Sequence, residues 1–255
     1  TFENYVEQFK IFVDSIVKGG SVTYNIEDEV VKEVVEASEN AIRKLPYTTP
    51  EYTVEDGETL LETNEGPMPI EVFGKHNLSN LAGAKWICQN MGVDEEDFYE
   101  AIATFSGASK RLEKIAEAST SIAYKDFAHS PSKVAATTKA VKEQYPNRKL
   151  IACLELHTYS SFNPEFLKEY KGALDAADEA VIFFLPESVA IKKLEAVTPE
   201  QISEAFQRKD LKIFTDAASF HEYLENQSYD NTTLLLMSSG NYGGFDLRKF
   251  QELMS

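Results

Sequence analysis

Residues 121–155 of this 255-residue chain read SIAYKDFAHSPSKVAATTKAVKEQYPNRKLIACLE. The segment predicts a strand over 121–126, a helix over 131–145 and a second strand over 149–155. The run Ile151–Leu154 is apolar without alternation, which is typical of strands that are covered on both faces. A strand, a helix and a strand in succession form the unit from which parallel sheets are built. The fold class that follows is α/β.

The same alternation of strands and helices continues to the end of the chain. Helices are predicted over 164–175, 199–207, 217–226 and 246–254, and strands over 179–185, 211–215 and 232–238. Five strands alternating with helices predict a doubly wound, mostly parallel, Rossmann-like sheet.

The first part of the chain has a different pattern. Helices are predicted over 2–17, 29–37, 76–91 and 94–104, and strands over 21–24, 51–54 and 70–73. Proline and glycine interrupt the short β-like stretches between 45 and 72. Residues 105–117 show no long period and are predicted to be a connector, which puts a domain boundary near 107–118.

Composition narrows the class of protein. The chain is 43% hydrophobic and 26% charged, with a net charge of −17, so it is globular and a poor binder of nucleic acid or anionic membranes. No run approaches the ~20 apolar residues of a membrane helix, and no signal peptide is visible. We therefore expect a cytoplasmic protein with no nucleic-acid or membrane partner. Cys88 and Cys153 are expected to be free thiols. Because the chain begins with Thr1, we expect it to be a piece of a longer protein.

A candidate ligand site lies where the strand 121–126 ends. Ligands of doubly wound sheets bind outside the carboxyl ends of the strands, and Asp126 and His129 stand at that end. Ser130 is expected to cap the following helix and Pro131 to be its first residue. The amide groups of such a helix start favour an anion. A capped turn without a ligand explains the same residues.

Two further segments follow strands at the same predicted edge. After Glu155 comes a loop rich in polar and aromatic side chains, namely His157, Thr158, Tyr159, Ser160 and Ser161. A substrate-binding loop and a solvated loop are both consistent with it. After the last strand comes the turn Ser238–Gly244, in which Gly240 and Asn241 could meet a ligand because glycine allows close backbone approach.

The first part of the chain offers a pair of amides. Asn77 and Asn80 are three residues apart at the start of a predicted helix and share one face. Carboxamides both donate and accept hydrogen bonds, as reading a purine edge requires. An exposed polar helix face is the simpler explanation.

Several other chemistries are disfavoured. Gly74-Lys75 is not part of a phosphate loop, because the pattern GxxxxGK[ST] is absent from the chain. The histidines form no HExxH motif and pair with no cysteine, so a zinc site is not expected. There is no GxSxG nucleophile elbow.

Three motifs, in order and spacing, resemble the Mur ligase family of ATP-dependent cell-wall ligases. The motifs are Gly74-x-His76-Asn77-x-x-Asn80, then Phe105-x-Gly107-x-x-x-Arg111-Leu112-Glu113, then Asp126-Phe127-Ala128-His129-x-Pro131. The resemblance covers nearly the whole chain. It implies that residues 1–110 are the second half of a central ATP-binding domain and residues 111–255 a Rossmann-like C-terminal domain. The phosphate loop, the metal ligands and a UDP-binding domain would lie upstream, so this piece alone is expected to be inactive.

The resemblance also implies a reaction of peptidoglycan synthesis or recycling. ATP, with Mg²⁺, activates the carboxylate of UDP-N-acetylmuramate as an acyl phosphate, and an amine then forms an amide, with release of ADP and phosphate. The segment 237–244 favours the tripeptide L-alanyl-γ-D-glutamyl-meso-diaminopimelate as the amine over L-alanine. A non-catalytic nucleotide-binding module is the alternative from another class.

Roles for individual residues follow from the same resemblance. Asn77 and Asn80 would contact adenine with His76 beside them, and Arg111 would reach the nucleotide from the connector. Asp126 and His129 would contact ribose or phosphates, and His157–Ser161 would face the amine substrate together with Gly240 and Asn241. No metal ligand is expected within the chain.

Two features depart from the family pattern. Lys125 and Ser130 stand where the family commonly has an acidic residue and a histidine. The loop after the strand 149–155 also lacks the arginine that related ligases place there, and arginine is the natural bidentate partner of a substrate carboxylate. The amine substrate therefore stays open at this stage.

Overall fold

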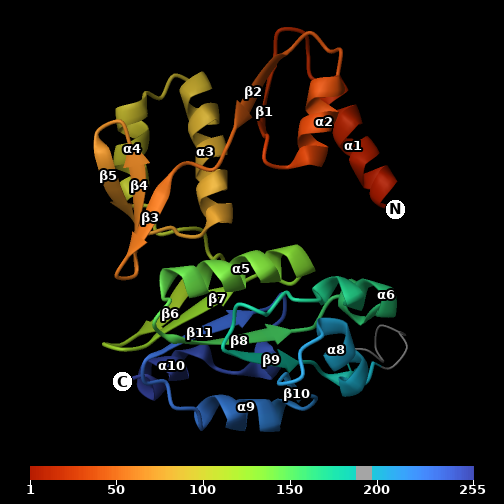
Figure 1. The fold of residues 1–255 in the computed structure, drawn as a ribbon, viewed down its shortest axis with the longest axis vertical. Coiled ribbons are helices and arrows are strands. Elements are labelled where there is room, and N and C mark those ends of the chain that lie inside the picture. The colour runs from red at the N-terminus through yellow and green to blue at the C-terminus, as the bar shows by residue number, and fades with distance from the viewer. Residues whose placement is uncertain (188–196) are drawn as a thin grey trace. The chain divides into compact units, whose positions relative to one another are not determined.

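The computed structural model describes residues 1–187 and 197–255, in which the chain forms two compact units (Figure 1). Unit 1 comprises Thr1–Ser106 and unit 2 comprises Gly107–Ser255.

Unit 1 begins with two helices and a pair of parallel strands. These elements are α1 (Phe2–Ser15), β1 (Ser21–Asn25), α2 (Glu29–Ala37) and β2 (Arg43–Tyr47). The helix starts follow from local capping: the hydroxyl of Thr1 accepts the amide of Asn4, and the carboxylate of Asp28 accepts two amides of the first turn of α2. A small core forms around Val13, Tyr24, Val34 and Val35.

The rest of unit 1 is an antiparallel three-stranded sheet with two helices. It consists of β3 (Tyr52–Glu55), β4 (Glu58–Thr63), β5 (Gly66–Ile70), α3 (Lys75–Asn90) and α4 (Glu95–Ala103). Its core contains Leu61, Ile70, Leu78, Leu81 and Phe98. The prediction of a strand over 70–73 is wrong, because β5 ends at Ile70, and β4 was not predicted.

Unit 2 is built on a six-stranded sheet in the order β10-β9-β8-β11-β7-β6. The strands are β6 (Glu113–Glu117), β7 (Ile122–Asp126), β8 (Lys149–Glu155), β9 (Glu179–Phe183), β10 (Lys212–Phe214) and β11 (Thr232–Met237). All neighbours are parallel except β6, which runs antiparallel to β7 at one edge. The predicted α/β class with a mostly parallel sheet is confirmed.

Helices cover both faces of this sheet. Helix α5 (Pro131–Gln144) lies on one face, and α9 (Ala217–Glu225) and α10 (Phe250–Leu253) lie on the other (Figure 1). Among the described residues, the remaining helices are α6 (Pro164–Leu167) and α8 (Pro199–Phe206), with single 3₁₀ turns at Ser160–Phe162, Lys168–Tyr170, Tyr242–Gly244 and Leu247–Lys249. Covered faces explain the continuous apolar runs Ile151–Leu154 in β8 and Leu234–Met237 in β11.

Three predictions about unit 2 need correction. Residues 113–117, predicted to be part of a connector, form β6; an edge strand that is half exposed carries only a weak apolar signal. The helix predicted over 164–175 ends as α6 at Leu167, and Gly172 adopts a left-handed φ of 72° in the turns that follow. The helix predicted over 246–254 is a 3₁₀ turn followed by the short α10.

Candidate functional site

The carboxyl edge of the unit 2 sheet brings together residues that are far apart in sequence. Strand β11 lies between β7 and β8, and Met237 is level with Asp126 on one side and Leu154 on the other. Asp126 and Glu155 therefore end the two strands that flank β11. Both carboxyl side chains are only 4% exposed.

Asp126 is held entirely by backbone amides. One carboxylate oxygen accepts the amide of Ala128 at 2.6 Å, and the other accepts the amide of Leu112 at 2.7 Å. Hydrogen bonds of this kind compensate for burying a carboxylate. Asp126 thus ties the end of β7 to the segment that carries Arg111.

That segment has an unusual backbone. Lys110 and Leu112 adopt left-handed φ values of 59° and 45°, which non-glycine residues adopt at a cost in energy. The carbonyl of Lys110 accepts the amide of Phe127 at 2.9 Å. Arg111 lies between Lys110 and Leu112. Its side chain is exposed, and its guanidinium carbon is 5.7 Å from the centre of the Phe127 ring. The backbone on both sides of Arg111 is therefore anchored to the end of β7.

His129 is oriented by the backbone. Its Nδ1 lies 2.7 Å from the carbonyl oxygen of Phe127, and because a carbonyl only accepts, Nδ1 carries the hydrogen. The carbonyl of His129 accepts the hydroxyl of Tyr170. The Nε2 atom has no hydrogen-bond partner among the described residues, so it can accept from a ligand.

The start of α5 is only partly as predicted. Ser130 occupies the N-cap position and Pro131 the first helical position, but the Ser130 side chain makes no capping hydrogen bond. Ser130 thus has the predicted N-cap position, but the prediction that its hydroxyl caps the helix is wrong. The first turn of α5 remains without a side-chain cap, next to His129.

The loop after β8 is largely tied to itself. The hydroxyl of Thr158 accepts the amide of Ser161 at 3.2 Å and lies 3.1 Å from the Ser160 hydroxyl, and the Ser161 hydroxyl donates to the Thr158 carbonyl at 2.8 Å. Ser161 is buried, whereas Tyr159 is 65% exposed. His157 is half-exposed, with Nδ1 4.0 Å from Oε1 of Glu155. Of the predicted loop residues, Ser161 is buried, whereas His157, Thr158, Tyr159 and Ser160 are exposed or half-exposed and can meet a ligand.

In unit 1, the predicted amide pair lies in the first turn of α3. Asn77 donates its amide hydrogen to the carbonyl of Phe73 at 2.9 Å, which leaves its carbonyl oxygen for a ligand. Asn80 is exposed and His76 is half-buried. Lys75, just before them, forms an ion pair of 2.9 Å with Glu27. These contacts hold the start of α3 against the segment after β1.

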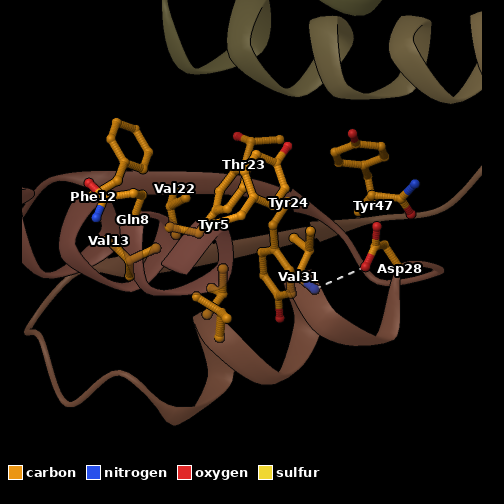
Figure 2. A pocket seen from close by; sticks show the side chains of 14 residues that line it. Tyr5, Gln8, Phe12, Val13, Val22, Thr23, Tyr24, Asp28, Val31 and Tyr47 are labelled. Atoms are coloured by element: carbon orange, nitrogen blue, oxygen red, sulfur yellow. Dashed lines mark hydrogen bonds between the residues drawn. The ribbon is translucent and has the colours of Figure 1, made fainter. Parts of the chain in front are cut away.

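An open apolar pocket of about 560 Å³ lies elsewhere in unit 1 (Figure 2). Tyr5 and Phe12 come to it from α1, Val22 and Tyr24 from β1, and Tyr47 from β2. The carboxylate of Asp28 accepts the amide of Val31 beside it. None of the predicted site residues lines this pocket.

Within residues 1–187 and 197–255, no three His, Cys, Asp or Glu side chains form a group that could hold a metal ion. Among the described helices, none combines the length and the apolar character that crossing a membrane requires.

Comparison with known proteins identifies the family. The family model described as "Mur ligase, glutamate ligase domain" matches residues 110–240, which include β7, β8 and β11 and both buried carboxylates. The chain belongs to the Mur ligase family. The family resemblance seen in the sequence motifs is thereby confirmed.

Relatives extend the match over nearly the whole of this Mur ligase chain. It is 26% identical over 256 residues to the UDP-N-acetylmuramate–L-alanine ligase of Carboxydothermus hydrogenoformans. This match covers 94% of this chain and 54% of the relative. The chain thus spans about half the length of that curated relative.

Solved structures show the same fold. A murein peptide ligase from Psychrobacter arcticus has a TM-score of 0.65 at 16% identity, covering 99% of this chain and 55% of the other. A MurF ligase from Thermotoga maritima, in complex with ADP, has a TM-score of 0.67 at 14% identity, covering 100% and 57%. The architecture of this Mur ligase chain is therefore that of known family members.

Sequence reasoning missed three residues at the carboxyl edge. Glu155, Ser238 and Tyr242 form a hydrogen-bonded group there, although only neighbouring residues were predicted as site residues. The sequence held a signal for two of them, because Glu155 and Ser238 are the first polar residues after the apolar runs Ile151–Leu154 and Leu234–Met237.

Proposed function

We propose that this chain is part of an ATP-dependent, ADP-forming amide ligase of peptidoglycan synthesis or recycling, with UDP-N-acetylmuramate as the acid substrate. The family match over residues 110–240 carries the proposal. The chain would contribute part of the central ATP-binding domain, in unit 1, and the C-terminal domain, in unit 2. The enzyme would act in the cytoplasm, where its nucleotide substrates are made.

The start of α3 has the chemistry to hold the adenine of ATP. The exposed carboxamide of Asn80 and the remaining carbonyl oxygen of Asn77 lie one turn apart, and together they can donate to and accept from a purine edge. His76 lies beside them. The residues present therefore fit the base of the nucleotide.

The carboxyl edge of unit 2 has the chemistry to hold a ribose or a phosphate. Arg111 supplies a guanidinium for phosphate oxygens, and His129 offers Nε2 to a ribose hydroxyl or a phosphate. We assign to Asp126 the task of holding the Arg111 segment through its bond to the amide of Leu112. Positioning of this kind accounts for most of catalysis in phosphoryl transfer.

Bound ATP would supply the phosphoryl group that turns the muramate carboxylate into an acyl phosphate, which the amine attacks to give the amide. No three His, Cys, Asp or Glu side chains among the described residues form a group that could hold the Mg²⁺ that accompanies ATP. No step is therefore assigned to a metal held by this chain.

For the amine we propose the tripeptide L-alanyl-γ-D-glutamyl-meso-diaminopimelate. The turn 237–244, Met-Ser-Ser-Gly-Asn-Tyr-Gly-Gly, is similar to the closing motif of murein peptide ligase. L-Alanine is the second candidate, because the curated relative is named an L-alanine ligase.

A substrate panel on the full-length polypeptide that contains this chain tests the proposal. Release of phosphate from ATP is measured with UDP-N-acetylmuramate and either the tripeptide or L-alanine. We expect turnover with the tripeptide. Turnover with L-alanine but not with the tripeptide would show that L-alanine is the amine substrate. ATP binding without turnover would favour a non-catalytic nucleotide-binding module.

A matched pair of variants on α3 tests the nucleotide site. Asn80→Ala should raise the KM for ATP about tenfold, the usual cost of one lost hydrogen bond to a ligand, and should leave the Tm unchanged because Asn80 is exposed. Asn90→Ala, an exposed asparagine at the other end of α3, is the control. Equal KM values for the two variants would reject the assignment of Asn80.

A further inference from the structure

The Glu155 carboxylate is the centre of a buried polar group at the end of β8. Its Oε2 atom accepts the hydroxyl of Ser238 and, at 2.9 Å, the amide of Tyr242. Both partners belong to the turn that follows β11. Because a buried charge is tolerated only when it is hydrogen-bonded, the carboxylate and this turn stabilise each other.

Gly240 lies directly against the same carboxylate. A Cβ atom at position 240 would come within 2.7 Å of Oε2 and 2.9 Å of Oε1 of Glu155, so only glycine fits without a shift. The amide of Gly240 donates to the Ser238 hydroxyl at 2.6 Å. The place of Gly240 is thus set by the Glu155 side chain and by the hydroxyl that this side chain orients.

Tyr242 shows that the turn is held under strain. It adopts a left-handed φ of 57° although it is not glycine, and such residues persist only where their surroundings hold them. Glu155 holds its amide, and Nε2 of His221 on α9 donates to its carbonyl at 2.9 Å. The ring is 2% exposed, and its hydroxyl has no partner among the described residues.

The part of the turn that faces solvent is its apex. Gly240 and Asn241 are exposed, while Ser238 and Tyr242 on either side are buried. The apex lies at the carboxyl edge of β8 and β11, the same edge as the loop with His157, where ligands of such sheets bind. Glu155 is buried beneath this apex, so its side chain offers little surface for direct contact with a ligand.

We propose that Glu155 is a positioning residue for the amine substrate, because its carboxylate fixes the 238–244 turn so that Gly240 and Asn241 contact that substrate. This inference rests on the proposed ligase function. Glu155 acts through the hydrogen bonds of Oε2, so an amide oxygen in the same place can take over its task. A direct ionic contact of Glu155 with the substrate would require the charge.

The test compares variants of the full-length polypeptide by steady-state kinetics. Glu155→Ala should raise the KM for the amine about tenfold or more, as expected when one or two anchoring hydrogen bonds are lost, with the KM for ATP unchanged. Glu155→Gln should restore the KM for the amine to near the parent value. Gly240→Ala, which leaves Glu155 in place but moves the turn, should raise the KM for the amine as Glu155→Ala does.

Glu179→Gln is the control for a purely structural effect. Glu179 begins β9, at the opposite end of the sheet, and accepts hydrogen bonds from two lysines and a tyrosine. Its substitution should lower the Tm but leave the KM for the amine unchanged.

Each outcome has a distinct meaning. An unchanged KM for the amine in both Glu155→Ala and Gly240→Ala would overturn the positioning role while ligation by the parent protein upholds the proposed function. If Glu155→Gln raised the KM for the amine as much as Glu155→Ala does, the positioning role would be wrong, because Glu155 would then recognise the substrate through its charge. Absence of ligation in the parent protein would overturn the proposed function, and this inference with it.

Discussion

The two units differ in how completely they bury their apolar side chains. Among the described residues, the exposed large hydrophobic side chains lie in unit 1, with Tyr159 as the one exception in unit 2. Val17 and Met91 of unit 1 are 76% and 79% exposed, whereas Ile151 and Leu235 in the unit 2 sheet are fully buried. Unit 2 thus has a complete core of its own, and unit 1 leaves much apolar surface in water.

The cause lies in the sheets. Unit 1 divides its strands between a parallel pair and a three-stranded antiparallel sheet, and unit 2 places six strands in one sheet with helices on both faces. Parallel strands are stable when both faces are covered, and two strands alone are marginal. We infer that unit 2 is the more stable unit and that unit 1 unfolds first.

The largest expected effect comes from removing an aromatic ring from the unit 2 core. Phe220 is fully buried and stacks on Phe183 with ring centroids 4.5 Å apart. Phe220→Ala should destabilise unit 2 by about 3–5 kcal/mol, measured by urea unfolding followed by far-UV circular dichroism. Phe12→Ala, which removes a ring that is 60% exposed in unit 1, should change the free energy of unfolding by less than about 0.5 kcal/mol.

The single tryptophan separates the two units in this experiment. Trp86 lies on α3, so its fluorescence follows unit 1. The transition seen by Trp86 should stay in place when Phe220→Ala shifts the transition seen by circular dichroism. A common shift of both signals would mean that the units unfold as one, and the comparison between them would fail.

Hydrogen exchange should show the same difference without any substitution. The amides of Leu235 in β11 and Ile151 in β8 are expected to exchange about 100-fold more slowly than that of Tyr24 in β1, which corresponds to about 2.7 kcal/mol. Mass spectrometry of peptides from the three strands measures this ratio. Equal protection of β1 and β11 would contradict the inference that unit 1 is less stable.

The same contrast explains which parts of the fold could be predicted. The segments β7, α5 and β8 have clear apolar patterns, and they form where the sequence predicts them. Strand β6 has as many residues as β7 but is half exposed, so its apolar pattern is too weak to predict. The helix expected over 164–175 ends at Leu167, and the turns that follow place Tyr170 against Phe206, a tertiary contact that local periodicity does not contain.

The candidate site shows the same limit. The position of Asp126 and Glu155 at one edge of the sheet follows from the order of strands and helices. The partners of Glu155 do not, because Ser238 and Tyr242 are 83 and 87 residues away in sequence. Pairing across that distance is decided by the insertion of β11 between β7 and β8, which no local pattern reveals.

The smallest expected effect concerns one glutamate in each unit whose pKa is low in the folded protein. Burial alone would raise the pKa of Glu179 in unit 2, but hydrogen bonds outweigh it and lower the pKa to about 2. The donors are Lys149, Lys212 and Tyr223. In unit 1, hydrogen bonds from Thr49 and Lys75 lower the pKa of Glu27 to about 2.

Because both pKa values in the folded state lie below the ordinary value of 4.5, both glutamates stabilise the fold above pH 4.5. The contribution is lost as the pH falls from 4.5 through about 2. We expect a loss of about 1–2 kcal/mol from Glu179, and less than about 1 kcal/mol from Glu27, whose side chain is 33% exposed and therefore screened by water. Urea unfolding between pH 5 and 2 measures both, with circular dichroism following the two units together and Trp86 fluorescence following unit 1 alone. Glu179→Gln should flatten the pH dependence of unit 2 alone; an unchanged acid slope in that variant would show that the ion pairs of Glu179 contribute nothing to the stability of unit 2.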